Sequence, residues 1–135
     1  ADTLNNVADC LYHLGELEAA RSAALDAVAL YRSAGNRLGG AIVRGTLAEI
    51  CLEQGDLAGA KQYIAAALAV VRELGAVVLE AEATSILALI HQAEQDDELA
   101  RRTARRAADL LRDAGANLLV RRISHLVDQS PATPG

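Results

Sequence analysis

Three histidines and two cysteines are the residue types that could carry catalysis or hold a metal. His13, His91 and His125 are separated by whole predicted helices, and none stands four residues from another or within a His-Glu-x-x-His motif. Cys10 and Cys51 do not form the close pair that a zinc site needs. The sequence therefore groups no base, nucleophile and metal ligand, and we expect a protein that is no enzyme and uses neither metal nor cofactor.

The stretch GNRLGG, from Gly35 to Gly40, is another pattern that could bind a ligand. A phosphate-binding loop needs a strand before it and a Gly-Lys-Ser/Thr sequence at its end, and this stretch has neither. We interpret it as a turn between two helices.

Charge and composition exclude further classes of protein. The 135 residues carry a net charge of −5 with a pI near 5.1, so the basic surface of a nucleic-acid-binding protein is missing. No apolar run approaches the roughly 20 residues that cross a bilayer. Two cysteines favour a reducing compartment over a disulfide. We expect a cytoplasmic protein and, because the sequence begins without Met inside a predicted helix, a piece of a longer one.

The sequence repeats itself at a spacing of 40 residues. Residues 49–76, EICLEQGDLAGAKQYIAAALAVVRELGA, hold the end of one helix, a turn and a second helix, and they align without a gap on residues 9–36 and 89–116. Alanine at fixed positions lets paired helices approach closely, and glycine ends a helix. The matched sets are Ala8, Ala48 and Ala88; Ala20, Ala60 and Ala100; Ala27, Ala67 and Ala107; Arg32, Arg72 and Arg112; and Gly35, Gly75 and Gly115.

Apolar residues recur at three- and four-residue steps and predict helices throughout. We expect one all-α domain over residues 1–129, made of three antiparallel helical hairpins at about 2–36, 38–76 and 77–115 and a C-terminal capping helix at 116–129. Residues 130–135, SPATPG, are expected to form a disordered tail.

The repeats resemble the tetratricopeptide repeat family over about residues 2–115. The resemblance rests on a small residue in each first helix, on turn glycines, and on two alanines in each second helix (Ala8, Ala48, Ala88; Gly15, Gly55; Ala20, Ala27, Ala60, Ala67, Ala100, Ala107). It implies a right-handed superhelix whose concave groove is lined by the first helix of each hairpin. It also implies a non-catalytic protein-interaction or regulatory module.

Several positions depart from the family's pattern. Leu4, Arg44 and Thr84 replace the usual aromatic near the start of each first helix, and Gln95 stands where the third hairpin should have its turn glycine. The spacing of 40 residues, in place of the commoner roughly 34, is similar to the longer-helix branch of kinesin light chain, LGN-type polarity adaptors and bacterial transcription regulators. The Ala- and Arg-rich composition is closest to the bacterial regulators.

By this resemblance, the groove should bind a protein or peptide. Its lining residues are expected to be Asn5, Asn6, Asp9, Tyr12, His13, Thr46, Glu49, Leu52, Glu53, Glu82, Ser85, Leu89 and Gln92. Carboxylates make its central part acidic, which favours a basic or amphipathic partner. The alternative is that these carboxylates only solvate an exposed surface. The cationic clamp of chaperone-docking members is absent, since its positions hold Asn5, Asp9, Thr46, Glu82 and Ile86.

A stripe of four arginines, Arg101, Arg102, Arg105 and Arg106, is the other charged feature. It could form a convex patch for an acidic partner, or acids nearby in the sequence could neutralise it. Four arginines on an acidic chain are too few to indicate nucleic-acid binding.

A second function class is self-association. The apolar end faces around Val7, Leu11, Leu119, Ile123 and Leu126 could pack against another copy of the chain. An enzyme or a sensor of small ligands is a third class, for which no constellation of residues was found.

Overall fold

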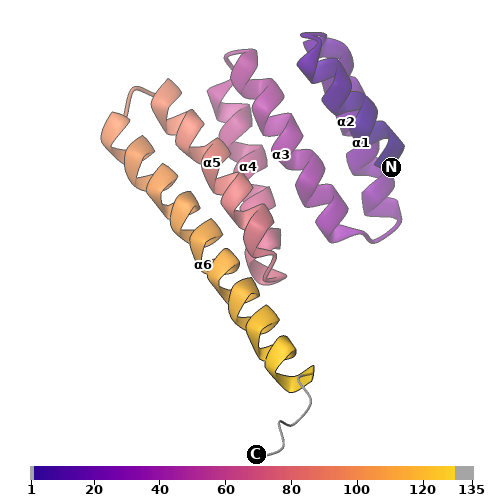
Figure 1. Cartoon of the computed structure of the whole chain (residues 1–135). Helices are drawn as coiled ribbons and strands as arrows, with labels where there is room; N and C mark the ends of the chain where they lie inside the picture. Colours follow the sequence, from indigo (N-terminus) through magenta and orange to yellow (C-terminus); the bar gives the residue numbers. More distant parts are fainter. Residues whose placement is uncertain (1, 130–135) are drawn as a thin grey trace, which may run out of the picture.

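The chain is built of helices throughout the part that a computed structural model describes, which is residues 2–129 and the side chains of residues 4–115 and Arg122. The helices are α1 (Asp2–His13), α2 (Leu17–Ser33), α3 (Arg37–Glu53), α4 (Leu57–Glu73), α5 (Val77–Ala93) and α6 (Asp97–Gln129). Successive helices run antiparallel (Figure 1). The predicted all-α chain of three helical hairpins is confirmed, and the expected tail at 130–135 lies outside the described residues.

The same turn joins every pair of neighbouring helices. The amide that follows each turn residue donates to the carbonyl five residues before it, at N···O distances of 2.8 to 3.0 Å; the donors are Glu16, Asn36, Asp56, Ala76 and Asp96. The turn residue has a positive φ, and it is glycine at 15, 35, 55 and 75 but Gln95, with φ 64°, in the last turn. Glycine adopts this conformation without the steric penalty of a Cβ atom. Gln95 therefore differs from the family's pattern in residue type, but the backbone conformation of its turn is the same as in the other turns.

Three of these turns also cap the helix that follows. Side-chain oxygens of Asn36, Asp56 and Asp96 each accept a hydrogen bond, at 2.8 to 3.2 Å, from the backbone amide three residues later. These bonds satisfy donors that the first turn of a helix leaves free. α2 and α5 begin without such a side-chain bond.

The hairpins stack so that their first helices share one side of the molecule. α1 pairs with α2, α3 with α4 and α5 with α6, while α2–α3 and α4–α5 contacts join the hairpins. α1 also contacts α3, and α3 contacts α5, whereas the backbones of α2, α4 and α6 do not approach one another closely among residues 4–115. The first helices α1, α3 and α5 thus form a continuous inner row. The repeat alanines Ala8, Ala20, Ala48 and Ala60 are 0 % exposed, which confirms that they lie at the close helix contacts.

Equivalent positions at the α2–α3 and α4–α5 contacts hold side chains of different sizes. Tyr31 on α2 is buried, and a Cβ atom at Gly39 on α3 would lie 2.4 Å from its ring. At the equivalent positions of the next hairpins, Val71 on α4 and Leu79 on α5 belong to one core cluster. The first contact pairs a large residue with glycine, whereas the second pairs two aliphatic residues of intermediate size.

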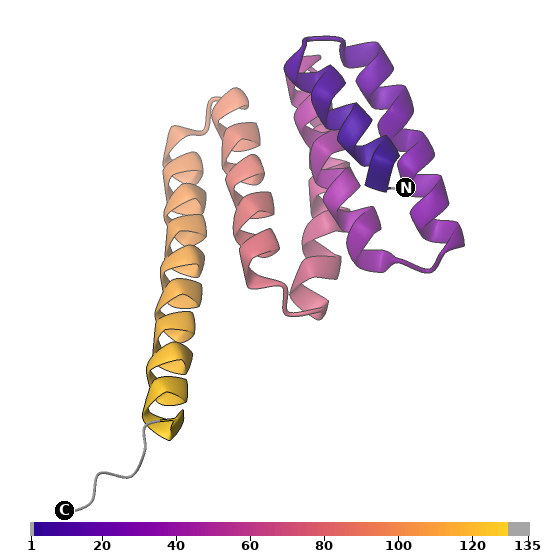
Figure 2. The ribbon, with the colours of Figure 1, turned by 45° about the vertical axis from the view of Figure 1, so that its right-hand side comes forward.

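α6 departs from the prediction. The sequence predicts a turn at Gly115 and a separate capping helix at 116–129, but α6 runs without a break from Asp97 to Gln129. Gly115 stays within the helix, although it stands in register with the turn residue Gly75. The C-terminal half of α6 extends past the stacked hairpins (Figures 1 and 2). Glycine permits a turn without enforcing one, and a continuous helix satisfies the same backbone groups internally.

We expect Gln95→Gly to stabilise the protein by about 0.5–1 kcal/mol, because glycine removes the strain of a Cβ atom at positive φ. Denaturant unfolding measures the change. Gln95→Ala keeps the Cβ atom and is the control, and it should leave stability nearly unchanged. Gly55→Ala, in the equivalent turn of the second hairpin, should destabilise by about 1 kcal/mol. Equal stability of Gln95→Gly and Gln95→Ala would contradict the prediction.

Candidate interaction groove

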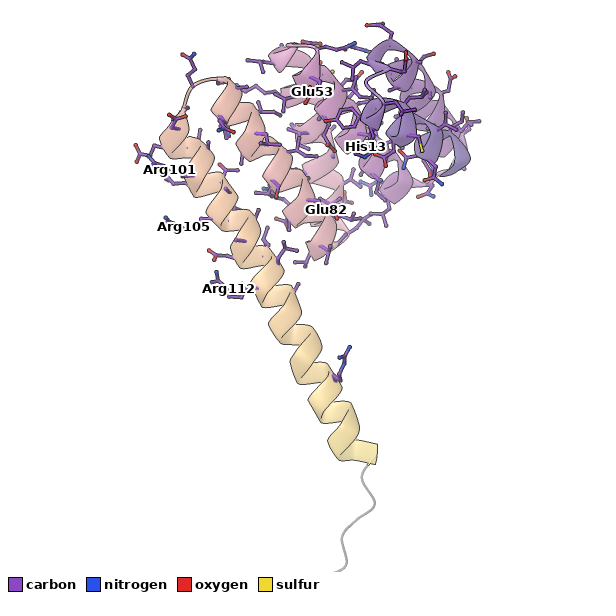
Figure 3. The ribbon with its side chains drawn as sticks, turned by 45° about the horizontal axis from the view of Figure 1, so that its top comes forward. His13, Glu53, Glu82, Arg101, Arg105 and Arg112 are labelled. Atoms are coloured by element: carbon purple, nitrogen blue, oxygen red, sulfur yellow. The ribbon has the colours of Figure 1, made fainter. Side chains whose placement is uncertain are left out.

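Carboxylates from all three first helices face a common space. α1 carries Asp9, α3 carries Glu49 and Glu53, and α5 carries Glu82. Burial is the largest cause that raises the pKa of Glu49, and the charges of Asp9, Glu82 and Glu53 raise this pKa further. Figure 3 shows Glu53 and Glu82 over the stacked hairpins together with His13. Repulsion between these like charges is thus built into this surface.

Tyr12 and His13 belong to the same region. Burial raises the pKa of the Tyr12 phenol, and the charges of Glu49, Glu53 and Asp9 raise it further. The His13 ring lies edge-to-face on Tyr12, with centroids 5.4 Å apart, and its Nε2 is 3.5 Å from Oδ1 of Asp9. The charge of His13 also lowers the pKa of Glu49. The fold therefore brings together six of the predicted groove residues, Asp9, Tyr12, His13, Glu49, Glu53 and Glu82.

An apolar hollow of about 320 Å³ continues the groove between α3 and α5. Its floor includes Ala67 and Val71 of α4, and its walls include Ile42, Thr46 and Glu49 of α3 and Glu82, Ser85 and Ile86 of α5. Ile42 is 40 % exposed. Carboxylates and aliphatic side chains thus share one depression, which suits a partner segment with both basic and apolar side chains.

Two of the predicted groove residues near the C-terminal end border a different hollow, and a third borders both. Leu89 and Gln92 line a second hollow, of about 790 Å³, between α5 and α6, and Ser85 lines both hollows. Leu89 stands at the repeat position of Asp9 and Glu49. At this repeat position, the acid of the first two hairpins is replaced by an apolar residue in the third, although Glu82 of the same helix still borders the groove.

The remaining predicted groove residues have more local environments. Asn5 is half-buried, and its Oδ1 is buried without a hydrogen-bond partner among the described residues. Asn6 is exposed. Leu52 is half-buried and packs against the core of α3, α4 and α5. Thr46 is half-buried in the wall of the hollow between α3 and α5.

The four arginines of the predicted convex patch are exposed on α6 and border two different hollows. Arg102, Arg105 and Arg106 border a shallow hollow that also contains Asp109. Arg101 lines the hollow between α5 and α6 instead. Figure 3 shows Arg101 and Arg105 along the side of α6.

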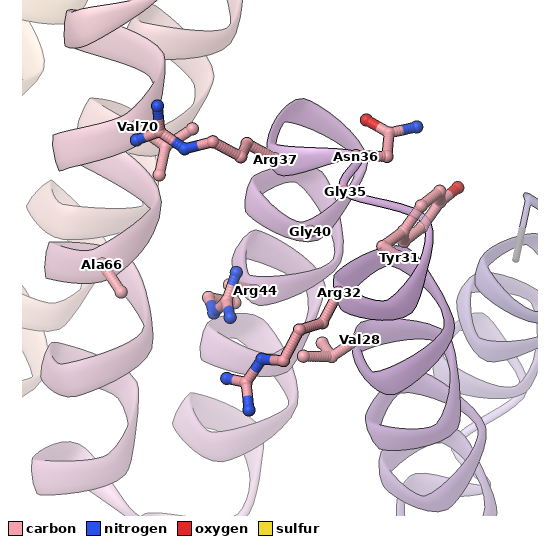
Figure 4. A pocket seen from close by; sticks show the side chains of 10 residues that line it. All are labelled: Val28, Tyr31, Arg32, Gly35, Asn36, Arg37, Gly40, Arg44, Ala66 and Val70. Atoms are coloured by element: carbon pink, nitrogen blue, oxygen red, sulfur yellow. The ribbon is translucent and has the colours of Figure 1, made fainter.

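A cleft of about 360 Å³ lies on the side of the second helices, and the sequence did not predict it. Figure 4 shows Arg32, Arg37 and Arg44 around it, beside Tyr31 and Val70. Arg37 is held by Glu73, with Nη1 donating to Oε1 at 3.0 Å, and this hydrogen bond lowers the pKa of Glu73. The signal was present in the sequence, since Arg37 and Arg44 are seven residues apart and share one helix face.

The two thiols differ in their burial. Cys10 is exposed and Cys51 is buried, and both are free. Burial raises the pKa of the Cys51 thiol, which lowers the fraction of reactive thiolate. Within the described chain, no three His, Cys, Asp or Glu side chains are placed to hold a metal ion. The same part of the chain contains no helix that is long and apolar enough to span a membrane.

Comparison with protein-family models connects this architecture to known proteins. The model of the tetratricopeptide repeat matches residues 1–73, just over half of the 135 residues. The chain belongs to the tetratricopeptide repeat family. No curated protein and no solved structure matches the chain significantly. Tetratricopeptide repeat domains generally mediate protein–protein interactions, and they typically act as non-enzymatic scaffolds.

The tetratricopeptide match covers α1 to α4, and the third hairpin continues the pattern beyond it. Helices begin at Leu17, Arg37, Leu57, Val77 and Asp97, each 20 residues after the last. The third hairpin is therefore built on the same plan as the second. Membership of the longer-helix branch stays a prediction.

We expect Glu49→Gln to stabilise this tetratricopeptide domain by a fraction of a kcal/mol at neutral pH. The native fold raises the pKa of Glu49 above its value in the unfolded chain, so ionisation of this carboxyl destabilises the native state. The stabilisation by Glu49→Gln should be present at pH values above the native pKa of Glu49, and it should shrink as the pH falls through this pKa. Urea unfolding at a series of pH values measures the difference.

Asp26→Asn, at an exposed position in the middle of α2, is the control for Glu49→Gln. It should change stability little over the same pH range. A stabilisation by Glu49→Gln that does not depend on pH would contradict the role given to its charge.

Proposed function

We propose that this domain binds a basic or amphipathic segment of a protein partner in its acidic groove. The observation that carries the proposal is the convergence of Asp9, Glu49 and Glu82 from three different helices. The mutual repulsion of these carboxylates is an unfavourable energy of the free domain. A Lys or Arg side chain placed among them would relieve the repulsion and gain attraction in its place, which favours binding.

The neighbouring hollow supports the amphipathic character of the partner. Ile42, Val71 and Ile86 line it, and it adjoins Glu49 and Glu82 without a break. An aliphatic side chain of the partner would be buried in this hollow, away from water, while a basic side chain would contact the carboxylates. Burial of apolar area would supply affinity, and the charges would supply specificity.

We further propose that the domain is part of a larger cytoplasmic regulator. There the groove would hold another protein or a segment of another domain. The free thiols Cys10 and Cys51 support a reducing compartment.

Selection of peptides from a random display library against the domain tests the groove. We expect enrichment of peptides in which Lys or Arg alternates with aliphatic residues. The triple variant Glu49→Lys, Glu53→Lys, Glu82→Lys should weaken binding of these peptides at least about tenfold, which corresponds to about 1.4 kcal/mol. Added salt should weaken binding to the unmodified domain, because the charges are partly exposed.

The matched control is Glu16→Lys, Asp26→Lys, Glu98→Lys, which makes the same change of net charge at exposed positions outside the groove. It should retain binding, and circular dichroism should show that both variants are folded. Peptides without a basic bias, or equal loss of binding in the two triple variants, would overturn the proposal.

A further inference from the structure

The hollow between α5 and α6 is an apolar shelf that the described chain leaves uncovered. We call it the α5–α6 shelf; it is formed mainly by Ala88, Leu89, Ala104, Ala107, Ala108 and Leu111. Leu89 is 49 % exposed and Leu111 is 48 % exposed. These exposed apolar side chains border an open depression of about 790 Å³, and exposed apolar patches of this kind often mark interaction sites.

The same positions one repeat earlier are buried. Ile64, Leu68 and Val71 on α4 are 1, 5 and 2 % exposed, and they stand 40 residues before Ala104, Ala108 and Leu111. α5 contacts α4 and contributes to the core that covers those positions. The α5–α6 shelf is therefore the next member of an established series of interfaces, and it lacks the helix that completes the others.

Residues 116–129 carry the pattern of that helix. Leu119, Ile123, Leu126 and Val127 stand 40 residues after Leu79, Ala83, Ile86 and Leu87, the residues of α5 that pack into the core with α4. Leu111 and Leu119 would form the third pair in the series that begins with Tyr31 and Gly39 and continues with Val71 and Leu79.

The other side of the same segment differs from α5 in sequence. Ala81, Thr84 and Ala88 are buried on α5, and their equivalents at 121, 124 and 128 are Arg, Ser and Asp. Ala41 and Ala48, one repeat earlier, belong to the core shared with α4, so these positions face the second helix of their own hairpin. Residues 116–129 are thus suited to cover a preceding hairpin and to leave their other side in water.

Within one molecule this segment does not reach the shelf, because α6 continues through Gly115 and extends beyond α5 (Figures 1 and 2). We propose that two copies of the chain exchange these segments, so that residues 116–129 of each copy lie on the α5–α6 shelf of the other. Each copy presents both the shelf and its cover, which allows a closed two-fold dimer. The dimer buries Leu89 and Leu111 without any change in the backbone of α6.

Sedimentation velocity of the whole chain over a wide range of concentrations tests the exchange. We expect a shift from the 14.1 kDa monomer to a dimer as the concentration rises. Leu111→Asp in the shelf and Ile123→Asp in the segment should each weaken the dimer at least about tenfold. Leu30→Asp, at a side chain that is 47 % exposed on α2, is the matched control and should leave the dimer intact.

Mixing the two variants distinguishes an exchange from other contacts. Leu111→Asp keeps an intact segment and Ile123→Asp keeps an intact shelf, so a mixture should form a heterodimer with one intact interface although each variant alone is monomeric. Gly115→Ala should tighten the dimer several-fold, because alanine favours the continuous helix and its Cβ atom would meet no neighbour within 4 Å.

Three results would overturn the proposal. A chain that stays monomeric at every concentration, with Ile123→Asp lowering its melting temperature, would show that the segment covers its own shelf. A dimer that survives both Leu111→Asp and Ile123→Asp would use another surface. A Gly115→Ala variant that dimerises more weakly would show that the helix is broken at this residue.

Discussion

The residue of positive φ at positions 15, 35, 55, 75 and 95 reverses the chain after each helix, and the amide that follows it closes the helix end. Because these turns recur every 20 residues, alternate helices present the same face to the same side of the molecule. Asp9 and Glu49 are neighbours in space for this reason. A residue inserted within a helix would rotate the part that follows by about 100° and would break this register, so the constant spacing of the turns is what keeps the acids of α1 and α3 on one side.

Close approach of the helices depends on small side chains at fixed positions. Fully buried alanines hold the hairpins together with little conformational entropy to lose, and the chain therefore needs few large core residues. The Tyr31–Gly39 contact and the Val71–Leu79 contact show that equivalent interfaces can hold side chains of different sizes. Such differences let the interfaces diverge in sequence while they keep the same spacing.

The sequence alone predicted the helices, the turns and the family, because each depends on local signals repeated at a constant interval. It failed at Gly115, where the local signal equals that of Gly75 and the outcome depends on how the following residues are packed. It predicted a groove lined by Asp9, Glu49 and Glu82 together with Leu89 and Gln92; the structure couples the three acids to one another, and it places Leu89 and Gln92 beside the hollow between α5 and α6, which register alone does not show. The cleft around Arg44 was missed because it combines residues of three helices.

Because Cys10 is exposed and Cys51 is buried, the reactivity of the two thiols can report local opening of the helices. Cys10 is exposed on α1, whereas Cys51 is buried where α3 meets α4 and has a raised pKa. A thiol reagent would modify Cys10 in the native state, and it would modify Cys51 only during fluctuations that separate α3 from α4. The rate of the second modification would then report the local stability of the central hairpin without any engineered label.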